Sequence, residues 1–451
     1  MNHHVTSSRR RFLQSAAALA AGPLILPSRV WSAETKPSGR VTLAFIGMGK
    51  QNAGLLGRFM GKPEVQVVAV CDVDASRREA AKKVVEANHA KRADAATFKG
   101  CTAYNDFREL LARPDIDAVV IATPDHWHAL ISIAAANAKK DIYCEKPLSQ
   151  SIHEARAMVN ATRRNGRVFQ VGSMQRSSRE FRVACELVRN GVIGKIQRVN
   201  AGFGGPARPC DLPEETAEPG LDWNLWLGPA PLRAYNSVLS PRGVHNHFPA
   251  WRNYREYGGG GITDWGAHHL DITHWGLGVD DSGPLELTPP ADATKAGAGV
   301  RMLYPNGVEV THVSENGVHF FGTGGEVFVN RGKIRVVVGG TQKAKSLAKE
   351  DQPPLAQQLD ALEREFLADP KVKLYRSTDH YADFLTAMRT RKPPICDVEV
   401  GARTVTGCHL LSLAYWNSAK LKWDAKREQF TGGTGNPKWL DVTYRGPWKL
   451  G

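Results

Sequence analysis

The first third of the chain alternates short apolar runs with segments of helical character. Runs dense in Val, Ile and Ala are typical of strands that are buried on both faces of a parallel sheet. The alternation therefore favours an α/β fold in which helices cover both sides of such a sheet. The predicted strands are 41–47, 65–72, 118–124 and 141–146, and the predicted helices are 53–60, 75–90 and 126–139.

The pattern changes from about Lys195, where β-like runs are separated by turn residues. Asn306 and Gly307 stand between two such runs, and this dipeptide is a strong signal for a tight hairpin. Further on, an apolar stretch of helical period predicts a helix over about 401–420 that packs back near the first domain. The predicted domains are 38–170 and 171–451, and the strands of the second lie within 195–203, 299–313 and 325–339.

The N-terminal residues form a basic cluster followed by an Ala-rich apolar run. The run is too short to span a bilayer, which needs about 20 apolar residues. The pair Arg9-Arg10 and the following Phe12-Leu13 resemble a twin-arginine export signal. We expect residues 1–33 to be such a signal, so the export machinery is an expected partner and the periplasm an expected location. The alternative is an ordinary Arg-rich N-terminus; no other segment is apolar enough to insert stably into a membrane.

Composition narrows the class of protein further. The 451 residues are enough for two domains, and the formal net charge is +14, of which four arginines of the signal segment supply +4. The remaining basic residues are interleaved with acids, which indicates a solvated surface and argues against a nucleic-acid-binding protein. The seven cysteines include no CxxC pair and are expected to be buried free thiols.

A glycine-rich turn follows the first predicted strand and opens the first predicted helix. Gly47 permits a tight turn, and Gly49 lets the backbone approach a pyrophosphate at the helix N-terminus. Asn52 stands where the usual motif has its third glycine, which allows close helix–strand packing. The context still indicates a dinucleotide site, which we expect to include Lys50, Gln51 and Asn52.

Asp72 ends the second predicted strand, where a carboxylate accepts hydrogen bonds from the adenosine ribose hydroxyls. Its charge would repel a 2′-phosphate, so Asp72 favours NAD over NADP as the cofactor. Arg77 and Arg78 follow closely and leave NADP open. The alternative is that Asp72 only caps the next helix.

Further motifs extend over nearly the whole chain after the signal segment. The stretches VVIATPDHWHA, CEKPLS, DWNLWLGPAP and GGGGITDWGAHHLD, in this order and spacing, resemble the Gfo/Idh/MocA oxidoreductases. The resemblance implies a Rossmann domain followed by an α+β domain on a large, open, mostly antiparallel sheet, assembled as a homodimer or homotetramer. It also implies that Thr123, Pro124, His128, Glu145 and Lys146 lie beside the cofactor.

Lys146 directly follows a predicted strand, so it emerges at the carboxyl edge of the sheet, where ligands bind in this architecture. Its ammonium can donate to a substrate hydroxyl and stabilise the oxyanion that forms as hydride leaves. Pro147 restricts the backbone here, and the resemblance implies that this peptide bond is often cis. The alternative is a solvated surface lysine.

Asp264 and His268 stand four positions apart, a spacing that places both side chains on one face of a helix. Because an imidazole titrates near neutrality, His268 is the candidate base for a secondary alcohol. The family motif has its aspartate and histidine at these positions, and Asp264 would orient the ring or share a proton with the substrate. His269 is expected to be structural, and Asp271 is expected to be a hydrogen-bonding support.

Aromatic residues are dense around this motif, and a Trp face stacks well on the apolar side of a sugar ring. We expect Trp251, Arg252 and Arg176, together with His268, to contact the substrate. Histidines also crowd the region, but their spacing resembles no standard zinc arrangement, so no metal is expected. The histidines in question are His245, His247, His268, His269 and His274.

These residues predict an exported NAD-dependent oxidoreductase that acts on a secondary alcohol of a sugar, glycoside or cyclitol. Because free nucleotide is scarce outside the cytoplasm, the cofactor is expected to bind during folding and to stay tightly held. One alternative is glycoside cleavage by transient ring oxidation and elimination, as in a branch of the family whose α-N-acetylgalactosaminidases replace the lysine kept here as Lys146. The other is an inactive sugar-binding regulator, which the retention of Lys146 and His268 disfavours.

Overall fold

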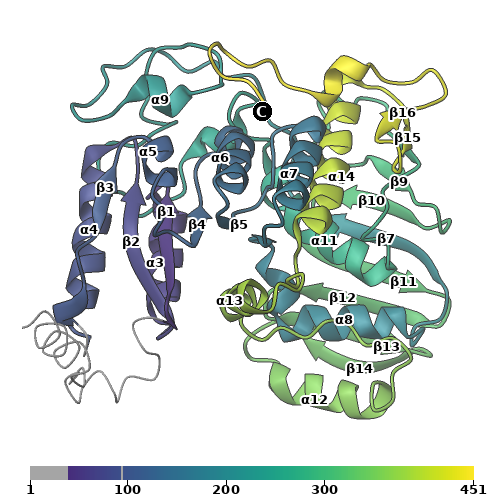
Figure 1. Ribbon diagram of the computed structural model, residues 1–451. Helices are drawn as coiled ribbons and strands as arrows, with labels where there is room; N and C mark the ends of the chain where they lie inside the picture. The colour runs from purple at the N-terminus through teal and green to yellow at the C-terminus, as the bar shows by residue number, and fades with distance from the viewer. Residues whose placement is uncertain (1–38, 93–94, 451) are drawn as a thin grey trace, which may run out of the picture.

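The structure, a computed structural model, describes residues 39–92 and 95–450, and the predicted signal segment lies outside the described residues. Figure 1 shows two sheets side by side, with helices α7 and α14 between them. None of the helices within the described ranges has the length and apolar character needed to cross a membrane.

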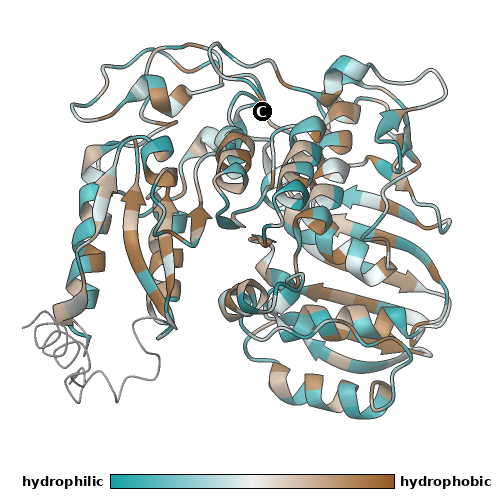
Figure 2. Cartoon of the chain, viewed as in Figure 1, coloured by the Kyte–Doolittle hydropathy of each residue, from teal (hydrophilic) through white to brown (hydrophobic). Residues whose placement is uncertain are grey.

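The first domain contains a six-stranded parallel sheet in the order β3-β2-β1-β4-β5-β6. Its central strands are strongly apolar (Figure 2) because helices cover both faces. The strand order reverses between β1 and β4, and ligands of such sheets bind at the carboxyl ends of strands at this point. The strands are β1 (Val41–Ile46), β2 (Val65–Cys71), β3 (Thr102–Tyr104), β4 (Ala118–Ile121), β5 (Asp141–Cys144) and β6 (Phe169–Val171).

Helices connect these strands, and side chains at the helix starts explain several boundaries. The Asp74 carboxylate accepts from the backbone amides of Ser76 and Arg77 at the start of α4. Ser151 and Glu154 form a capping box at the start of α7. The connecting helices are α3 (Lys50–Met60), α4 (Ala75–His89), α5 (Phe107–Leu111), α6 (Asp125–Asn137) and α7 (Ile152–Arg164), with the short η2 (Ala95–Thr97).

The second domain contains a ten-stranded sheet in which only β7 and β10 pair in parallel, so the predicted fold class is confirmed. The predicted hairpin is also confirmed, since β9 and β10 pair around Asn306-Gly307 and Gly307 has φ +80°. The strands are β7 (Ile196–Gly202), β8 (Glu286–Thr288), β9 (Arg301–Leu303), β10 (Glu309–Val313), β11 (Gly317–Gly322), β12 (Gly325–Asn330), β13 (Lys333–Val338), β14 (Thr341–Ser346), β15 (Leu421–Asp424) and β16 (Gln429–Phe430).

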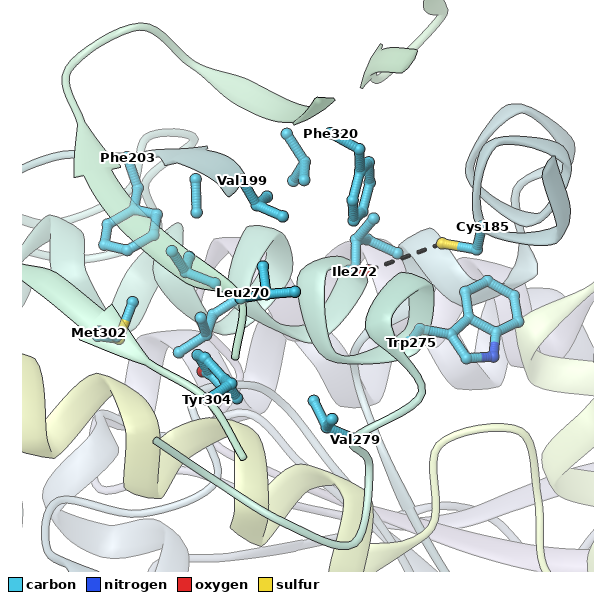
Figure 3. Packing of buried hydrophobic residues seen from close by; sticks show 14 of the residues in the cluster. Cys185, Val199, Phe203, Leu270, Ile272, Trp275, Val279, Met302, Tyr304 and Phe320 are labelled. Atoms are coloured by element: carbon cyan, nitrogen blue, oxygen red, sulfur yellow. Dashed lines mark hydrogen bonds between the residues drawn. The ribbon is translucent and has the colours of Figure 1, made fainter. Parts of the chain in front are cut away.

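Helices cover one face of this sheet and form the main core. Figure 3 shows Leu270 and Ile272 of α11 packing against Val199 of β7 and Phe320 of β11. Gly276 permits this approach, because a Cβ there would lie 2.5 Å from the Phe320 ring. The helices of this domain are α8 (Arg179–Arg189), α9 (Trp223–Leu227), α10 (Gly261–Asp264), α11 (Gly266–Leu277), α12 (Leu355–Phe366), α13 (His380–Thr390) and α14 (Val398–Asn417), with the short η3 (Met174–Ser177), η4 (Ala250–Asn253) and η5 (Pro437–Leu440).

Two features join the domains at the carboxyl edge of the parallel sheet. Helix α14 packs against both α7 and α11. Its bounds, 398–417, are close to those of the helix predicted over 401–420. The segment between β7 and α10 has little regular structure and crosses over the first domain (Figure 1). There the Asp222 amide donates to the Val73 carbonyl at 3.0 Å, and Leu221 forms a β-bridge with Asp74. This crossing places residues of the second domain above the glycine-rich turn.

Candidate active site

The glycine-rich turn leads from β1 into α3 and lines a first cavity. Gly47 has φ +82°, and a Cβ there would lie 2.8 Å from Thr123 Cγ2, so both conformation and space require glycine. Gly49 is the N-cap of α3, and a Cβ there would meet nothing within 4 Å. The open space beside Gly49 is therefore continuous with the cavity at the N-terminus of α3, where amide groups attract an anion.

Asn52 does not line the cavity, contrary to the expectation that it contacts the cofactor. Its side chain is fully buried, and Nδ2 lies 3.1 Å from the Ile46 carbonyl and 3.4 Å from the Val120 carbonyl. An amide in the position of the usual third glycine thus bridges the ends of β1 and β4. Asn52 in place of the third glycine therefore changes how α3 is attached to the parallel sheet, and the turn at Gly47 and Gly49 is unchanged.

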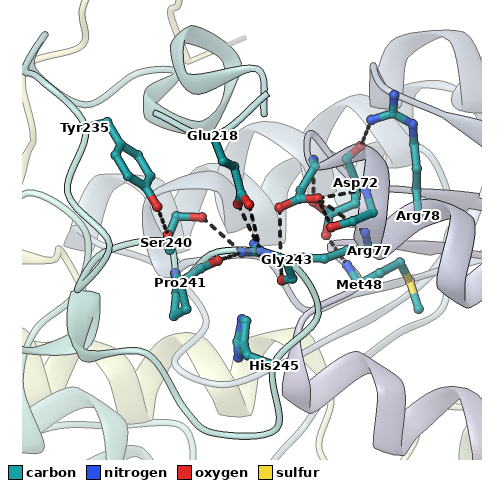
Figure 4. A network of polar contacts seen from close by, with 12 residues as sticks. Met48, Asp72, Arg77, Arg78, Glu218, Tyr235, Ser240, Pro241, Gly243 and His245 are labelled. Atoms are coloured by element: carbon teal, nitrogen blue, oxygen red, sulfur yellow. Dashed lines mark hydrogen bonds and ion pairs between the residues drawn. The ribbon is translucent and has the colours of Figure 1, made fainter. Parts of the chain in front are cut away.

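Asp72 lies at the end of β2 and lines the first cavity (Figure 4). Its carboxylate accepts from the amide of Met48 at 2.6 Å and from the amide of Asp74 at 2.8 Å. Burial raises the pKa of Asp72, while Arg77 and the two amides act in the opposite direction. The side chain is thus held in the position where a ribose hydroxyl would be bound.

Arg77 and Arg78, the two arginines that left NADP open, both donate to groups of the protein. Arg77 donates to the carbonyl of Gly243 at 3.0 Å, to Ser240 and to the carbonyl of Pro241 (Figure 4). Arg78 Nη1 lies 3.1 Å both from the Asp72 carbonyl and from Asn105 Oδ1. These contacts agree with NAD, the cofactor favoured by Asp72.

The partners of Arg77 belong to a segment, residues 239–249, that we call the strap. The strap lines the first cavity together with the glycine-rich turn. Lys50 ties its far end, since Nζ lies 3.2 Å from the Asn246 carbonyl and also bonds the Asn246 side chain. The strap was not foreseen, because nothing in its own sequence indicates which elements it contacts.

Lys146 and His268 line one second cavity, which adjoins the first. Thr123, Gln51 and Trp251 are among the residues that line both. The two candidate catalytic side chains come from different domains: Lys146 follows β5, and His268 lies in the first turn of α11. The peptide bond between Lys146 and Pro147 is cis.

Asp264 forms an ion pair with Lys146, with Nζ 2.5 Å from Oδ1 and 2.8 Å from the Asp264 carbonyl. Burial alone would raise the pKa of Asp264, but Lys146 and Arg252 outweigh it and hold that pKa below its usual value. The expectation that Asp264 orients the His268 ring is wrong. Asp264 is the last residue of α10, whereas His268 belongs to α11, and the Asp264 carboxylate bonds Lys146 instead of the ring.

His268 is 4% exposed, and its Nδ1 has no hydrogen-bond partner among the described residues. Burial lowers its pKa well below the usual range, and the charges of Lys146 and Arg331 lower it further. The ring is therefore neutral at neutral pH and can accept a proton. His269, by contrast, lies with Nδ1 2.5 Å from the Gly202 carbonyl, a contact that fits its expected structural role.

Glu145 and Gln51 connect the two cavities. Gln51 Nε2 donates to Glu145 Oε1 at 2.8 Å, and the Lys146 amide donates to Oε2 at 3.2 Å. Burial raises the pKa of Glu145, and the Lys146 charge opposes this shift. Gly172 makes room for this carboxylate, since a Cβ there would lie 2.6 Å from Oε2.

Thr123, Pro124 and His128 surround the end of β4. Pro124 is the N-cap of α6 and lines the first cavity. The His128 ring lies 2.7 Å from the Pro147 carbonyl and 3.0 Å from the Thr123 carbonyl. Burial lowers its pKa to about 4, so the neutral ring donates to one of the two. His128 thus positions the loop that carries Lys146.

Of the expected substrate contacts, Trp251 and Arg252 line the second cavity and Arg176 does not. Arg176 belongs to η3 and is 2% exposed, with Nε 3.0 and 2.9 Å from the two Asp271 carboxylate oxygens. It also binds Asp280, with Nη2 2.7 Å from Oδ1. The expectation for Arg176 is wrong because its guanidinium binds the buried Asp271 and the partly exposed Asp280, and Asp271 is the support that was expected.

Sequence reasoning missed several residues of the second cavity. Asp125 follows Pro124 at the start of α6, a position that indicates only a helix start. Arg331 lies in the turn between β12 and β13. No sequence motif marks it as a site residue, because only the folded sheet brings that turn to α11. The residues missed are Asp125, Met174, Phe248, Trp265 and Arg331.

The crowded histidines separate in the fold. His274 Nε2 lies 2.7 Å from the Tyr304 hydroxyl in the core, and His245 lies on the strap. In the ranges that the structure describes, no three His, Cys, Asp or Glu side chains are grouped so as to hold a metal ion.

The first cavity fits a dinucleotide on its own geometry. Gly49 has no side chain to fill the space at the N-terminus of α3, where a pyrophosphate would bind. Asp72 lies at the end of β2, where a carboxylate would bind the ribose hydroxyls. The wall shared with the second cavity would then bring the nicotinamide end towards Lys146 and His268.

Comparisons with known proteins agree with this arrangement. Residues 41–173 match the Gfo/Idh/MocA family model described as an oxidoreductase family with an NAD-binding Rossmann fold. Residues 207–450 match the model of the C-terminal alpha/beta domain of the same oxidoreductase family.

Relatives with curated names match over part of their length. A levoglucosan dehydrogenase of Pseudarthrobacter phenanthrenivorans is 37% identical over 33% of this chain and 40% of its own. A glycosyl hydrolase family 109 protein of Stenotrophomonas maltophilia is 27% identical over 48% of this chain and 49% of its own. The chain thus spans less than half the length of these relatives.

Solved structures share the fold. A WlbA dehydrogenase from Bordetella pertussis, in complex with NADH and UDP-GlcNAcA, superposes with a TM-score of 0.56. The match covers 85% of this chain and 98% of that one at 17% sequence identity, so it supports the architecture alone.

Proposed function

Because the chain belongs to the Gfo/Idh/MocA oxidoreductase family, we propose that it is an NAD-dependent enzyme that oxidises a secondary alcohol of a sugar, glycoside or cyclitol. One observation carries the proposal: Lys146 and His268, far apart in sequence, line a single cavity that adjoins the first cavity. NAD, when bound, supplies the hydride acceptor.

Lys146 binds the reacting oxygen. An ammonium has three N–H donors, and two of them are directed at the carboxylate and carbonyl of Asp264. The third is available for the substrate oxygen, where a donor stabilises the negative charge that develops as hydride leaves. Asp264 thus positions the lysine.

His268 removes the hydroxyl proton. A base must be deprotonated before the reaction, and the neutral ring that burial enforces meets this condition at neutral pH. The nearby cations oppose protonation of the ring, which favours passing the proton on to solvent once the alcohol has been oxidised.

The cofactor stays bound between turnovers, and a second substrate, or the same substrate later in one catalytic cycle, takes the hydride back from it. The strap supports this part of the proposal, because it lines the first cavity and Arg77 and Lys50 tie it to the first domain. A tightly held cofactor suits a chain that folds before twin-arginine export. Export and assembly into a homodimer or homotetramer remain predictions from the sequence.

Two measurements test the proposal. Mass spectrometry of the nucleotide released by denaturing the purified protein is expected to find NAD(H) in near-stoichiometric amount. Absorbance at 340 nm then follows cofactor reduction by a panel of alcohols that includes levoglucosan and inositol. Lys146→Met is expected to slow reduction at least about 100-fold with unchanged nucleotide content, whereas exposed Lys83→Met has no effect. A protein that takes up no nucleotide, or full activity of the Lys146 variant, contradicts the proposal.

Redox-neutral glycoside cleavage is the second candidate, favoured by the similarity to glycosyl hydrolase family 109 proteins. The ring carbon would give its hydride to NAD while the same cavity residues bind its hydroxyl and take the proton, which acidifies the adjacent C–H and permits elimination. Water then replaces the leaving group and the hydride returns to the ring. Release of an aglycone without net NADH from a panel of nitrophenyl glycosides supports cleavage, and a keto-sugar with reduced cofactor supports oxidation.

A further inference from the structure

The second cavity is lined by three cationic and three acidic side chains. Its cations are Lys146, Arg252 and Arg331, and its acids are Asp125, Glu145 and Asp264. Asp264 bonds Lys146 and lies 3.9 Å from Arg252 Nε, and neither arginine has a carboxylate oxygen within hydrogen-bonding distance among the described residues.

Arg252 belongs to η4 and is held by aromatic rings more than by acids. Its guanidinium lies 4.2 Å from the centroid of the Trp251 ring and 5.2 Å from that of Phe248. One donor, Nη1, bonds the Pro249 carbonyl at 3.2 Å, and Nε is 3.9 Å from Asp264 Oδ1. Most of its five N–H donors therefore remain for a ligand.

Arg331 approaches the cavity from the turn between β12 and β13. Its guanidinium lies over the Trp265 ring, 4.7 Å from the centroid. The Gln175 side-chain amide, in the orientation that gives hydrogen bonds to both its oxygen and its nitrogen, connects Arg331 to α11. The Gln175 oxygen accepts from Arg331 Nε at 3.2 Å, and the Gln175 nitrogen donates to the His268 carbonyl at 3.1 Å. Among the described residues, no carboxylate oxygen lies within 4.0 Å of this guanidinium.

The acids of the cavity are not placed to pair with the two arginines. Among the described residues, no carboxylate oxygen lies within hydrogen-bonding distance of either guanidinium, and the nearest approach given for Arg252 is 3.9 Å. Asp125 is 4% exposed, and burial raises its pKa well above the usual range, which favours the neutral carboxyl group. A guanidinium remains charged at any pH at which a protein is folded, so both arginines are available to an anionic ligand.

We propose that the substrate is a sugar acid, whose carboxylate is bound by Arg331 and Arg252 while its secondary alcohol lies at Lys146 and His268. This inference rests on the proposed function and adds the substrate class to it. A carboxylate matches the planar guanidinium fork, and both arginines lack a hydrogen-bonded carboxylate of the protein. A sugar phosphate presents a similar anionic group, and titration with glucose 6-phosphate distinguishes the two.

Binding to the purified holoprotein tests the inference. Fluorescence of the bound reduced cofactor is titrated with matched pairs: glucuronate and glucose, galacturonate and galactose, gluconate and glucitol, with glucose 6-phosphate as a further ligand. Each acid is expected to bind about ten- to a hundredfold more tightly than its neutral partner, the range for a charge-assisted contact. Arg331→Met is expected to remove that preference with little change for neutral sugars, and Arg331→Lys to restore part of it.

Arg335→Met is the matched control. Arg335 lies on β13 of the same hairpin, outside the cavity, and pairs with Glu326 at 2.9 Å. This variant is expected to keep the preference for acids. Equal binding of acids and neutral sugars, a preference that survives in Arg331→Met, or tighter binding of glucose 6-phosphate than of every carboxylate would overturn the inference. The proposed function fails separately, if the protein holds no NAD(H) or no alcohol changes the absorbance at 340 nm.

Discussion

Replacing Arg176 by methionine tests whether this guanidinium belongs to the fold or to the substrate site. Arg176 binds Asp271 through Nε and Asp280 through Nη1 and Nη2, at distances of 2.7 to 3.0 Å. Methionine retains an unbranched side chain but removes the charge and its donors. Asp271, which is fully buried, then keeps only the Thr404 hydroxyl, 3.2 Å from Oδ1, as a hydrogen-bond donor.

The cost follows from the chemistry of the carboxyl group that is left. Without Arg176, the Asp271 carboxylate would be a buried charge with no cation beside it, so it takes up a proton and becomes neutral. An aspartate in the unfolded chain has a pKa of about 3.9, so holding it protonated at pH 7 costs about 4 kcal/mol. This agrees with the roughly 3–5 kcal/mol lost when a buried ion pair is broken. At pH 5.5 the same proton costs about 2 kcal/mol, because the unfolded carboxylate is then closer to its own pKa.

Urea unfolding, followed by tryptophan fluorescence and circular dichroism at pH 7.0 and pH 5.5, measures this difference. Arg176→Met is expected to lose more stability at pH 7.0 than at pH 5.5. The double variant Arg176→Met with Asp271→Asn is expected to be more stable at pH 7.0 than Arg176→Met alone, since it lacks the unpaired carboxylate. Arg335→Met, which removes a partly exposed arginine, serves as the control. Unfolding at wild-type urea concentrations combined with a raised KM would refute the reasoning and return Arg176 to the substrate site.

Three further predictions concern the cofactor and acid stability. Gly47→Ala is expected to weaken NADH binding at least about tenfold, because its Cβ would lie 2.8 Å from Thr123 Cγ2 at φ +82°. Gly54→Ala, whose Cβ meets nothing within 4 Å, leaves binding unchanged in the same fluorescence titration. Arg77→Met frees one end of the strap and is expected to raise the dissociation rate of NADH several-fold in stopped-flow displacement; an unchanged rate shows that the strap does not retain the cofactor. Lowering the pH from 6.5 towards 4 is expected to destabilise the fold. Histidines of the unfolded chain become protonated in this range, whereas the buried rings stay neutral, so each ring lowers the free energy of unfolding by about 2 kcal/mol at pH 5. A constant urea midpoint between pH 6.5 and 4.5 contradicts this. The rings whose pKa burial lowers to about 4 are His126, His128, His269, His274, His312, His380 and His409.

Sequence reasoning located the main elements of the first domain because their signals are local. Apolar runs and a glycine with positive φ depend on neighbours within a few residues, so β1, β2 and the turn at Gly47 could be read directly. Three-residue strands such as β3 are too short for a periodic signal and were missed. Motifs located Lys146, Asp264 and His268, which line one cavity.

Errors arose where a residue's role depends on a partner far away in the chain. Arg176 was placed at the substrate because an arginine near a motif can bind a hydroxyl, but Asp271 and Asp280 bind it in the core. Asp264 was paired with His268 from their spacing, but it binds Lys146, which arrives from the other domain. Spacing along a helix records which side chains share a face and not what faces them.

The chain by itself therefore determined the two-domain architecture and the glycine-rich turn and supplied the candidate reactive side chains, since each rests on short-range pattern or on residue chemistry. The tertiary structure alone decided that Arg331 joins the second cavity, that the strap covers the first, and that the His268 ring is neutral. These outcomes depend on long-range packing, which sets both the distances between charges and the loss of solvent that shifts a pKa.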